Sequence, residues 1–300
     1  MQFHARHSAR AFVLFAGTSF AALFFALAGL GGTSVAGASA PVFYLDIGAS
    51  ASVGVQPTPL NPDGAPTARG YANDLVALEA AKGVALELTQ IGCPGESTTT
   101  MLYGGDRCYQ SPATQMSTAI AFLQSHYSQT GIVTVDLGFN NVVKCLRLAS
   151  GVSTCLEQGI DTVRQELPRI LSTLQAAAGP NVHFVGVGHY DPFLASALLG
   201  TTGMASATES LGAMTMLNDT ITGIYQSFLM PTAKVARAFR SFDRVLTARA
   251  GVGKVATNVA QACNLTWMCQ PAPYGPNLHP NDAGYRAIAA SIAATLPATL

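Results

Sequence analysis

The feature that most constrains the fold is a regular alternation of short apolar runs with helical patterns. Apolar runs bounded by turn residues predict strands at 42–47, 85–90, 132–137, 182–186 and 233–236. Helical patterns predict helices at 71–82, 114–127, 154–178, 211–228, 258–263 and 282–294. Such alternation is typical of a parallel sheet covered by helices. We therefore expect an α/β protein, a single-domain three-layer α/β/α sandwich with a mainly parallel, flavodoxin-like sheet of these five strands.

Two segments bear on how continuous the helices are. Pro168 lies inside the third helical pattern and is expected to end or kink that helix. The segment Gly200–Gly212 is rich in Thr, Ser and Ala and predicts a loop rather than a domain boundary. No internal repeat or low-complexity linker divides the sequence, so we expect one domain.

The first 38 residues have the pattern of a secretory signal peptide. Two arginines precede an uncharged run from Ala11 to Leu30, and small residues follow up to Ala38. We expect cleavage after Ala38, a catalytic domain over 41–300, and a location in the cell envelope or outside the cell. An uncleaved anchor is the alternative, because roughly 20 apolar residues can span a bilayer. Glycines dilute the run, which favours cleavage.

Composition limits the partners. Without the leader, its two arginines are gone, so 14 basic side chains face 16 acidic ones and the formal charge is about −2. No basic patch is visible, which argues against a nucleic-acid partner. The remaining length of about 260 residues suits one domain with a sizeable core. We expect a monomer, with transient membrane or envelope contact left open.

The cysteines predict disulfides rather than a metal site. All of them follow the leader, at local spacings: Cys93 and Cys108, Cys145 and Cys155, Cys263 and Cys269. No Cys-X-X-Cys motif occurs, and exported proteins form disulfides readily. Six cysteines allow many connectivities, but pairing of neighbours would staple three separate loops. We expect no metal and no cofactor.

Four short islands carry the chemistry: Gly48–Ser52, Cys93–Glu96, Gly138–Asn141 and His279–Asn281. In order they offer a hydroxyl, a glycine amide, a side-chain amide and an imidazole, which are the parts that an acyl-transfer site needs. The first three islands directly follow predicted strands. Because ligands bind beyond the carboxyl ends of parallel strands, these islands should meet at one edge of the sheet.

This constellation resembles the SGNH (GDSL-type) hydrolase family, and its secreted bacterial members in particular, from about residue 42 to residue 290. The resemblance implies that Ser50 is the nucleophile and His279 the base. It also implies an oxyanion hole made by the Ser50 amide, Gly95 and Asn140. The implied function is that of a secreted esterase or lipase acting on a small-molecule ester or lipid.

Each of these residues also has a structural interpretation. Ser50 could cap a helix, and Asn140 and Gly95 could be ordinary turn residues. His279 could face solvent from its loop. His189, at the end of the fourth predicted strand, is a second candidate for the base.

The sequence departs from the family pattern at three acidic positions, which here are Ala49, Asn141 and Pro276. The third loss matters most, because an acid at that point normally orients the imidazole and stabilises its charged form. A backbone carbonyl such as that of Pro276, or the Asn277 side chain, could orient His279 instead. Asp282 is expected to begin the last helix. Two alternatives follow from the lost acids and the shared chemistry: an impaired envelope protein that binds lipid or glycan, and an acyltransferase.

Overall fold

The computed structural model describes residues 41–148, 150–249 and 253–300 of the chain. The expected signal peptide and its cleavage site lie outside these residues. In the described part, no helix is long and apolar enough to cross a membrane.

A five-stranded sheet with every neighbouring pair parallel forms the centre of the fold. Its order is β4-β1-β5-β6-β7, with bounds β1 (Val42–Gly48), β4 (Leu86–Gln90), β5 (Gly131–Asp136), β6 (Val182–Val187) and β7 (Thr232–Ala233). Four strands form where they were predicted. The fifth prediction was largely wrong, because β7 has two residues and Val235–Ala238 is the short helix α7. Alanine and arginine in that segment are strong helix formers.

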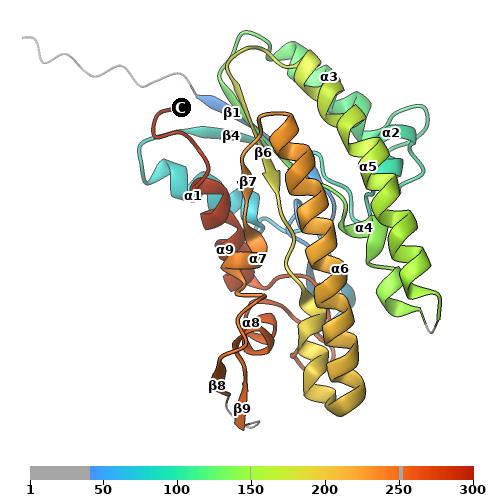
Figure 1. Cartoon of the computed structure of the whole chain (residues 1–300). Helices are drawn as coiled ribbons and strands as arrows, with labels where there is room; N and C mark the ends of the chain where they lie inside the picture. The colour runs from blue at the N-terminus through green and yellow to red at the C-terminus, as the bar shows by residue number, and fades with distance from the viewer. Residues whose placement is uncertain (1–40, 149, 250–252) are drawn as a thin grey trace, which may run out of the picture. The chain divides into compact units, whose positions relative to one another are not determined.

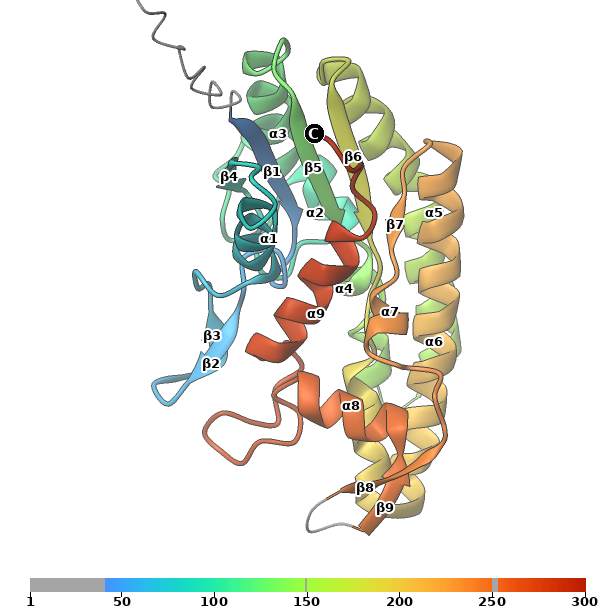
Figure 2. The same ribbon diagram turned by 90° about the vertical axis from the view of Figure 1, so that its left-hand side faces the viewer.

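Helices cover both faces of the sheet, which confirms the three-layer sandwich (Figure 1). One face carries α1 (Tyr71–Ala80), α7 and α9 (Asp282–Ala293), and Figure 2 shows α1 and α9 in front of the strands. The other face carries α2 (Thr98–Tyr103), α3 (Gln115–Ser125), α5 (Val152–Ala177) and α6 (Gly200–Ser227). Strand β1 contributes to both cores, since alternate side chains point to opposite faces. Phe43 and Leu45 pack on the second face, and Val42 and Tyr44 on the first.

The prediction of a loop at Gly200–Gly212 was wrong, and the helix that contains Pro168 does not end at that residue. Helix α6 already begins at Gly200, where a loop was predicted. Its polar first turns are stable as a helix because Ala207 is buried and the Ser210 hydroxyl donates to Asp191 (2.9 Å). Helix α5 runs through Pro168 without ending there. Leu167 and its neighbours on the same face are buried in the core, which offsets the backbone hydrogen bond that proline lacks.

Smaller elements that the sequence did not predict surround the carboxyl end of the sheet. They are two antiparallel hairpins, β2–β3 (Gln56–Thr58, Asn61–Ala65) and β8–β9 (Leu246–Arg249, Gly253–Ala256), the helix α4 (Phe139–Val142), and the 3-10 helices η1 (Cys145–Arg147) and η2 (Pro192–Leu199). Helix α8 (Thr257–Leu265) forms about where it was expected.

The connectivity creates a crevice where the site was expected. Strand β1 lies between β4 and β5. The chain reaches β4 through α1 on one face, and then reaches β5 through α2 and α3 on the other face. A change of direction of this kind leaves a binding crevice at the carboxyl ends of the strands. The loops that follow β1, β4 and β5 all open into it.

Candidate active site

The four predicted site residues line one pocket of about 570 Å³. Ser50 follows β1, Gly95 follows β4, and Asn140 is in α4 just after β5. His279 comes from the loop before α9, so the C-terminal segment does return to the carboxyl edge of the sheet. A pocket of this volume can hold a small-molecule ligand.

The loop that carries Ser50 is held by a buried glutamine. The Gly48 amide donates to Gln115 Oε1 (3.0 Å), and Gln115 Nε2 donates to the Gly48 carbonyl (2.9 Å) and to Glu96 Oε2 (3.0 Å). Only glycine fits at position 48, because a Cβ there would lie 2.7 Å from the Asp136 carbonyl oxygen. Within the described residues, the Ser50 amide has no hydrogen-bond acceptor, so it is available to an oxyanion.

Gly95 presents a backbone amide to the pocket. Its φ of +92° is strained for any residue with a side chain, and the space beside its Cα is open. The Cys93–Cys108 disulfide fixes this loop from one side. On the other side lies Glu96, a buried carboxyl whose pKa is raised by desolvation to about 7. Elsewhere in the described chain the Gly95 amide finds no acceptor.

Asn140 is positioned by the loop that it faces. Its Nδ2 donates to the Glu96 carbonyl oxygen at 2.9 Å. An amide nitrogen carries two N–H groups, so one remains for a ligand in the pocket. The loops that carry Ser50, Gly95 and Asn140 thus follow three neighbouring strands and bring hydrogen-bond donors to one pocket, where an oxyanion could be bound.

The Asn277 side chain sets the orientation of the imidazole. His279 Nδ1 lies 2.8 Å from Asn277 Oδ1, which also accepts from the His279 backbone amide (2.9 Å). Asn277 Nδ2 donates to the carbonyl oxygens of Pro62 (2.9 Å) and Asp63 (3.2 Å). These two acceptors fix the amide, so that its oxygen must face the ring. Nδ1 therefore carries the proton, Nε2 keeps its lone pair, and the ring contact does not involve the Pro276 carbonyl.

Further hydrogen bonds and a disulfide hold the loop that carries His279, which we call the base loop. The Trp267 amide donates to the His279 carbonyl (3.1 Å), and the Tyr190 hydroxyl donates to the Leu278 carbonyl (3.0 Å). The Cys263–Cys269 disulfide closes the segment just before it. With Cys145–Cys155, the structure pairs all six cysteines between sequence neighbours, as predicted.

The His279 imidazole is poised in its neutral form. Burial lowers its pKa to about 4, and the nearby Arg147 charge acts in the same direction. The Asp282 carboxylate is engaged elsewhere and does not supply a negative charge to His279. This carboxylate accepts from Gln56 Nε2 (2.8 Å) and pairs with Arg69 (3.2 Å) at the start of α9, while Asn281 caps that helix.

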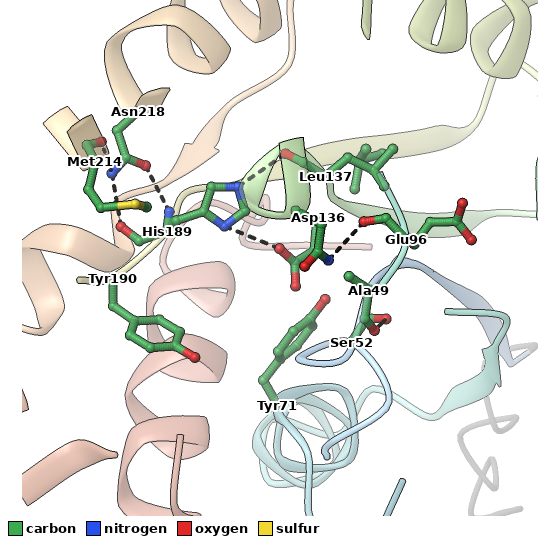
Figure 3. Close-up of polar contacts among 12 residues, drawn as sticks. Ala49, Ser52, Tyr71, Glu96, Asp136, Leu137, His189, Tyr190, Met214 and Asn218 are labelled. Carbon is green, nitrogen blue, oxygen red and sulfur yellow. Dashed lines mark hydrogen bonds and ion pairs between the residues drawn. The ribbon is translucent and has the colours of Figure 1, made fainter. Parts of the chain in front are cut away.

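His189, the second candidate for the base, has both ring nitrogens engaged (Figure 3). Nε2 lies 3.1 Å from the Leu137 carbonyl and must carry a proton, and Nδ1 lies 3.4 Å from Asp136 Oδ1. Burial raises the pKa of Asp136 and lowers that of His189, so the uncharged pair is favoured. The pair borders a cavity of about 30 Å³ that also touches Ser50. His279 has the more available nitrogen.

The potential metal ligands that cluster in the described residues do not form a metal site. The group is Cys93, Cys108 and Asp106. Both sulfurs are joined in a disulfide, so neither is a thiolate that could bind a metal.

The sequence did not reveal the buried polar residues that hold the site. Gln115 reads as an ordinary residue at the start of a predicted helix, and Asp136 as the end of an apolar run. A buried polar group requires a partner, and these partners lie far away in the sequence. Of these three residues, only Glu96 had a local signal, because it is the last residue of the Cys93–Glu96 island.

Comparison with solved structures identifies proteins that have a similar fold. The chain is similar to phospholipase A1 from Streptomyces albidoflavus NA297, with 18% identity over 86% of this chain and 100% of that one, at a TM-score of 0.54. It is also similar to an extracellular lipase from Streptomyces rimosus, with 15% identity over 85% of this chain and 100% of that one, at a TM-score of 0.53. No protein-family model and no curated sequence matches significantly. At these identities the likeness concerns the fold, which is the one expected from the SGNH resemblance.

Proposed function

We propose that this protein is an exported serine hydrolase that cleaves carboxylic esters through an acyl-enzyme on Ser50. The observation that carries the proposal is that Ser50, Gly95, Asn140 and His279 line one pocket. A hydroxyl, three hydrogen-bond donors and a neutral imidazole with a free nitrogen are the groups that acyl transfer needs.

In the proposed mechanism, His279 Nε2 takes the proton from Ser50 Oγ as Oγ attacks the ester carbonyl carbon. The tetrahedral oxyanion accepts hydrogen bonds from the Ser50 and Gly95 amides and from Asn140 Nδ2. The carbon–oxygen bond to the alcohol then breaks, and the alcohol leaves with the proton from His279. Water, deprotonated in turn by His279, attacks the acyl-enzyme and releases the acid.

The oxyanion donors carry most of the expected rate enhancement. Removing one donor of this kind from a serine enzyme costs about 3 kcal/mol, or roughly two orders of magnitude in rate. Asn277 orients His279 but is uncharged, so it stabilises the imidazolium less than a carboxylate would. We therefore expect modest turnover that relies on the oxyanion hole.

Other observations support the proposal. The two fold neighbours are by name a phospholipase A1 and an extracellular lipase, which favours an ester or lipid substrate. The leader and the three disulfides favour export. Gly95 and Lys144 in the pocket wall are exposed, so water can reach an acyl-enzyme, which favours hydrolysis over acyl transfer.

A non-catalytic envelope protein that binds lipid or glycan is the second candidate. Ala49 and Pro276 stand where the family pattern has acids, and burial makes His279 a weak base. Such a protein would keep the pocket without an activated serine.

A fluorophosphonate probe separates these candidates, because only an activated serine reacts promptly with it. We expect rapid labelling of the wild type, none of Ser50→Ala, and very slow labelling of His279→Ala. Ser52→Ala is the matched control. Its hydroxyl is buried and donates to the Ala49 carbonyl (2.8 Å), so labelling should persist. Unchanged labelling or p-nitrophenyl ester turnover in Ser50→Ala would refute the proposal, and thermal unfolding checks that each variant folds.

A further inference from the structure

Two cations stand on one wall of the candidate active-site pocket. Lys144 and Arg147 are exposed and line the same pocket as Ser50 and His279. They belong to the segment that runs from α4 into η1, which the Cys145–Cys155 disulfide anchors. In the described chain neither side chain forms an ion pair or a hydrogen bond. Asp63 is the acidic side chain among the lining residues, so the pocket wall is positive overall.

The positive charges of Lys144 and Arg147 disfavour protonation of His279 unless a negative charge lies nearby. Proton transfer from Ser50 makes His279 an imidazolium, and a nearby positive charge disfavours that state. Arg147 already acts in this direction on the pKa of His279. The oriented side chain of Asn277 supplies no negative charge to offset it. A cationic wall beside the base would therefore slow the reaction of a neutral ester.

An anionic substrate would instead favour protonation of His279. A phosphate or carboxylate seated between Lys144 and Arg147 would offset their charge and make the imidazolium easier to form. Arginine can bind such a group through two parallel N–H bonds, and lysine adds a mobile point charge. The substrate would then contribute part of the negative charge that the Asn277–His279 pair lacks.

Resting on the function proposed above, we propose that Lys144 and Arg147 form a subsite for an anionic group carried by the ester substrate. The shared chemistry is a phosphate or a carboxylate, and it can belong to the alcohol part or to the acyl part of the ester. The subsite selects such esters and speeds their reaction.

Two matched pairs of esters test the proposal and distinguish these sources. Octanoylglycerol phosphate against octanoylglycerol places the anion on the alcohol side. The p-nitrophenyl hemiester of adipic acid against its methyl ester places the anion on the acyl side. We expect kcat/KM to favour the anionic member of at least one pair by about tenfold, and the preference to shrink as salt is raised.

Variants show which residues carry the preference. Arg147→Gln should lower kcat/KM for the anionic member by about tenfold and raise it for the neutral member, because His279 becomes a stronger base. The acid limb of the neutral ester's pH profile should move to higher pH. Arg147→Lys should recover part of the preference. Arg164→Gln is the control, because Arg164 is exposed on α5, pairs with Asp161 and does not line the pocket.

The outcomes separate this inference from the proposed function. An active wild type without preference in either pair overturns the subsite alone. Parallel losses for both members in Arg147→Gln also overturn it, since they indicate structural damage rather than a lost anion contact. If the wild type hydrolyses no ester and the fluorophosphonate probe does not react, the proposed function itself fails.

Discussion

Replacing Asn277 by alanine tests how this site works without an acid in its third position. Asn277 Oδ1 is the acceptor for His279 Nδ1 at 2.8 Å, and the bond becomes charge-assisted when the ring is protonated. Hydrogen bonds to charged groups contribute about 1.5–3 kcal/mol. At roughly 1.4 kcal/mol for each tenfold change in rate, Asn277→Ala should lower kcat/KM by about 10- to 150-fold.

The assay is p-nitrophenyl butyrate hydrolysis with a full pH profile. Asn61→Ala is the matched control, because Asn61 is an exposed asparagine of strand β3, the strand whose Pro62 and Asp63 carbonyls hold Asn277. Its Nδ2 donates to the Gly64 carbonyl (2.9 Å), and it does not line the pocket. The wild-type kcat/KM should rise with pH through about 4, where His279 becomes neutral, and then level off. In Asn277→Asp the added negative charge should move this limb to higher pH. Activity within twofold of wild type in Asn277→Ala, or an unmoved limb in Asn277→Asp, would show that Asn277 does not orient the base.

Three further changes probe the surroundings of the site. Burial raises the pKa of Asp46 from 3.8 to about 8. Between these two values the folded state holds a proton that the unfolded state has released. The free energy of unfolding therefore falls as the pH rises from about 4 to about 8. Urea unfolding should give a lower free energy of unfolding at pH 8 than at pH 6.5, and Asp46→Asn should make this difference smaller by up to about 2 kcal/mol. An equal difference in both proteins would show that Asp46 is not protonated in the folded state. Asp282→Ala should lower stability by about 1–3 kcal/mol, because buried Gln56 loses a charged acceptor, and should leave most ester turnover. A loss of turnover as large as that of His279→Ala would place Asp282 in the catalytic machinery. Replacing Cys93 and Cys108 together by alanine opens a loop with a sequence separation of 15 and should cost about 3 kcal/mol in thermal unfolding. It should also lower kcat/KM as the Gly95 amide loses its fixed position, and unchanged kcat/KM would show that the loop needs no staple.

The layered fold was predictable because its strands are local signals. Runs such as Val42–Leu45 are apolar on both faces, as is typical of a buried parallel strand, and turn residues follow the strands. Helix α6 was missed over its first turns, because Thr, Ser and Ala there have no amphipathic pattern and become helical only through packing against η2. The short β7 and both hairpins likewise depend on tertiary contacts rather than on propensity.

The sequence predicts which residues line the pocket but not the contacts that hold them in position. Ser50, Gly95 and Asn140 follow strands, so their common edge follows from the parallel sheet. That Asn277 rather than a backbone carbonyl contacts His279 depends on the carbonyls of Pro62 and Asp63, more than 200 positions earlier in the sequence. No local pattern encodes such a contact.

The hydrogen bonds from Asn277 to Pro62 and Asp63 in strand β3 make two parts of the pocket wall differ in how well they tolerate sequence change. An insertion or deletion at Pro62 or Asp63 would displace Asn277 and alter the tautomer of His279, so selectivity could not be changed there without affecting turnover. The part of the wall formed by 143–147 is held by its own disulfide and, among the described residues, shares no hydrogen bond with the loop that carries His279. Directed evolution toward new esters should therefore accept substitutions at Val143, Lys144 and Arg147 and reject insertions or deletions at Pro62 and Asp63.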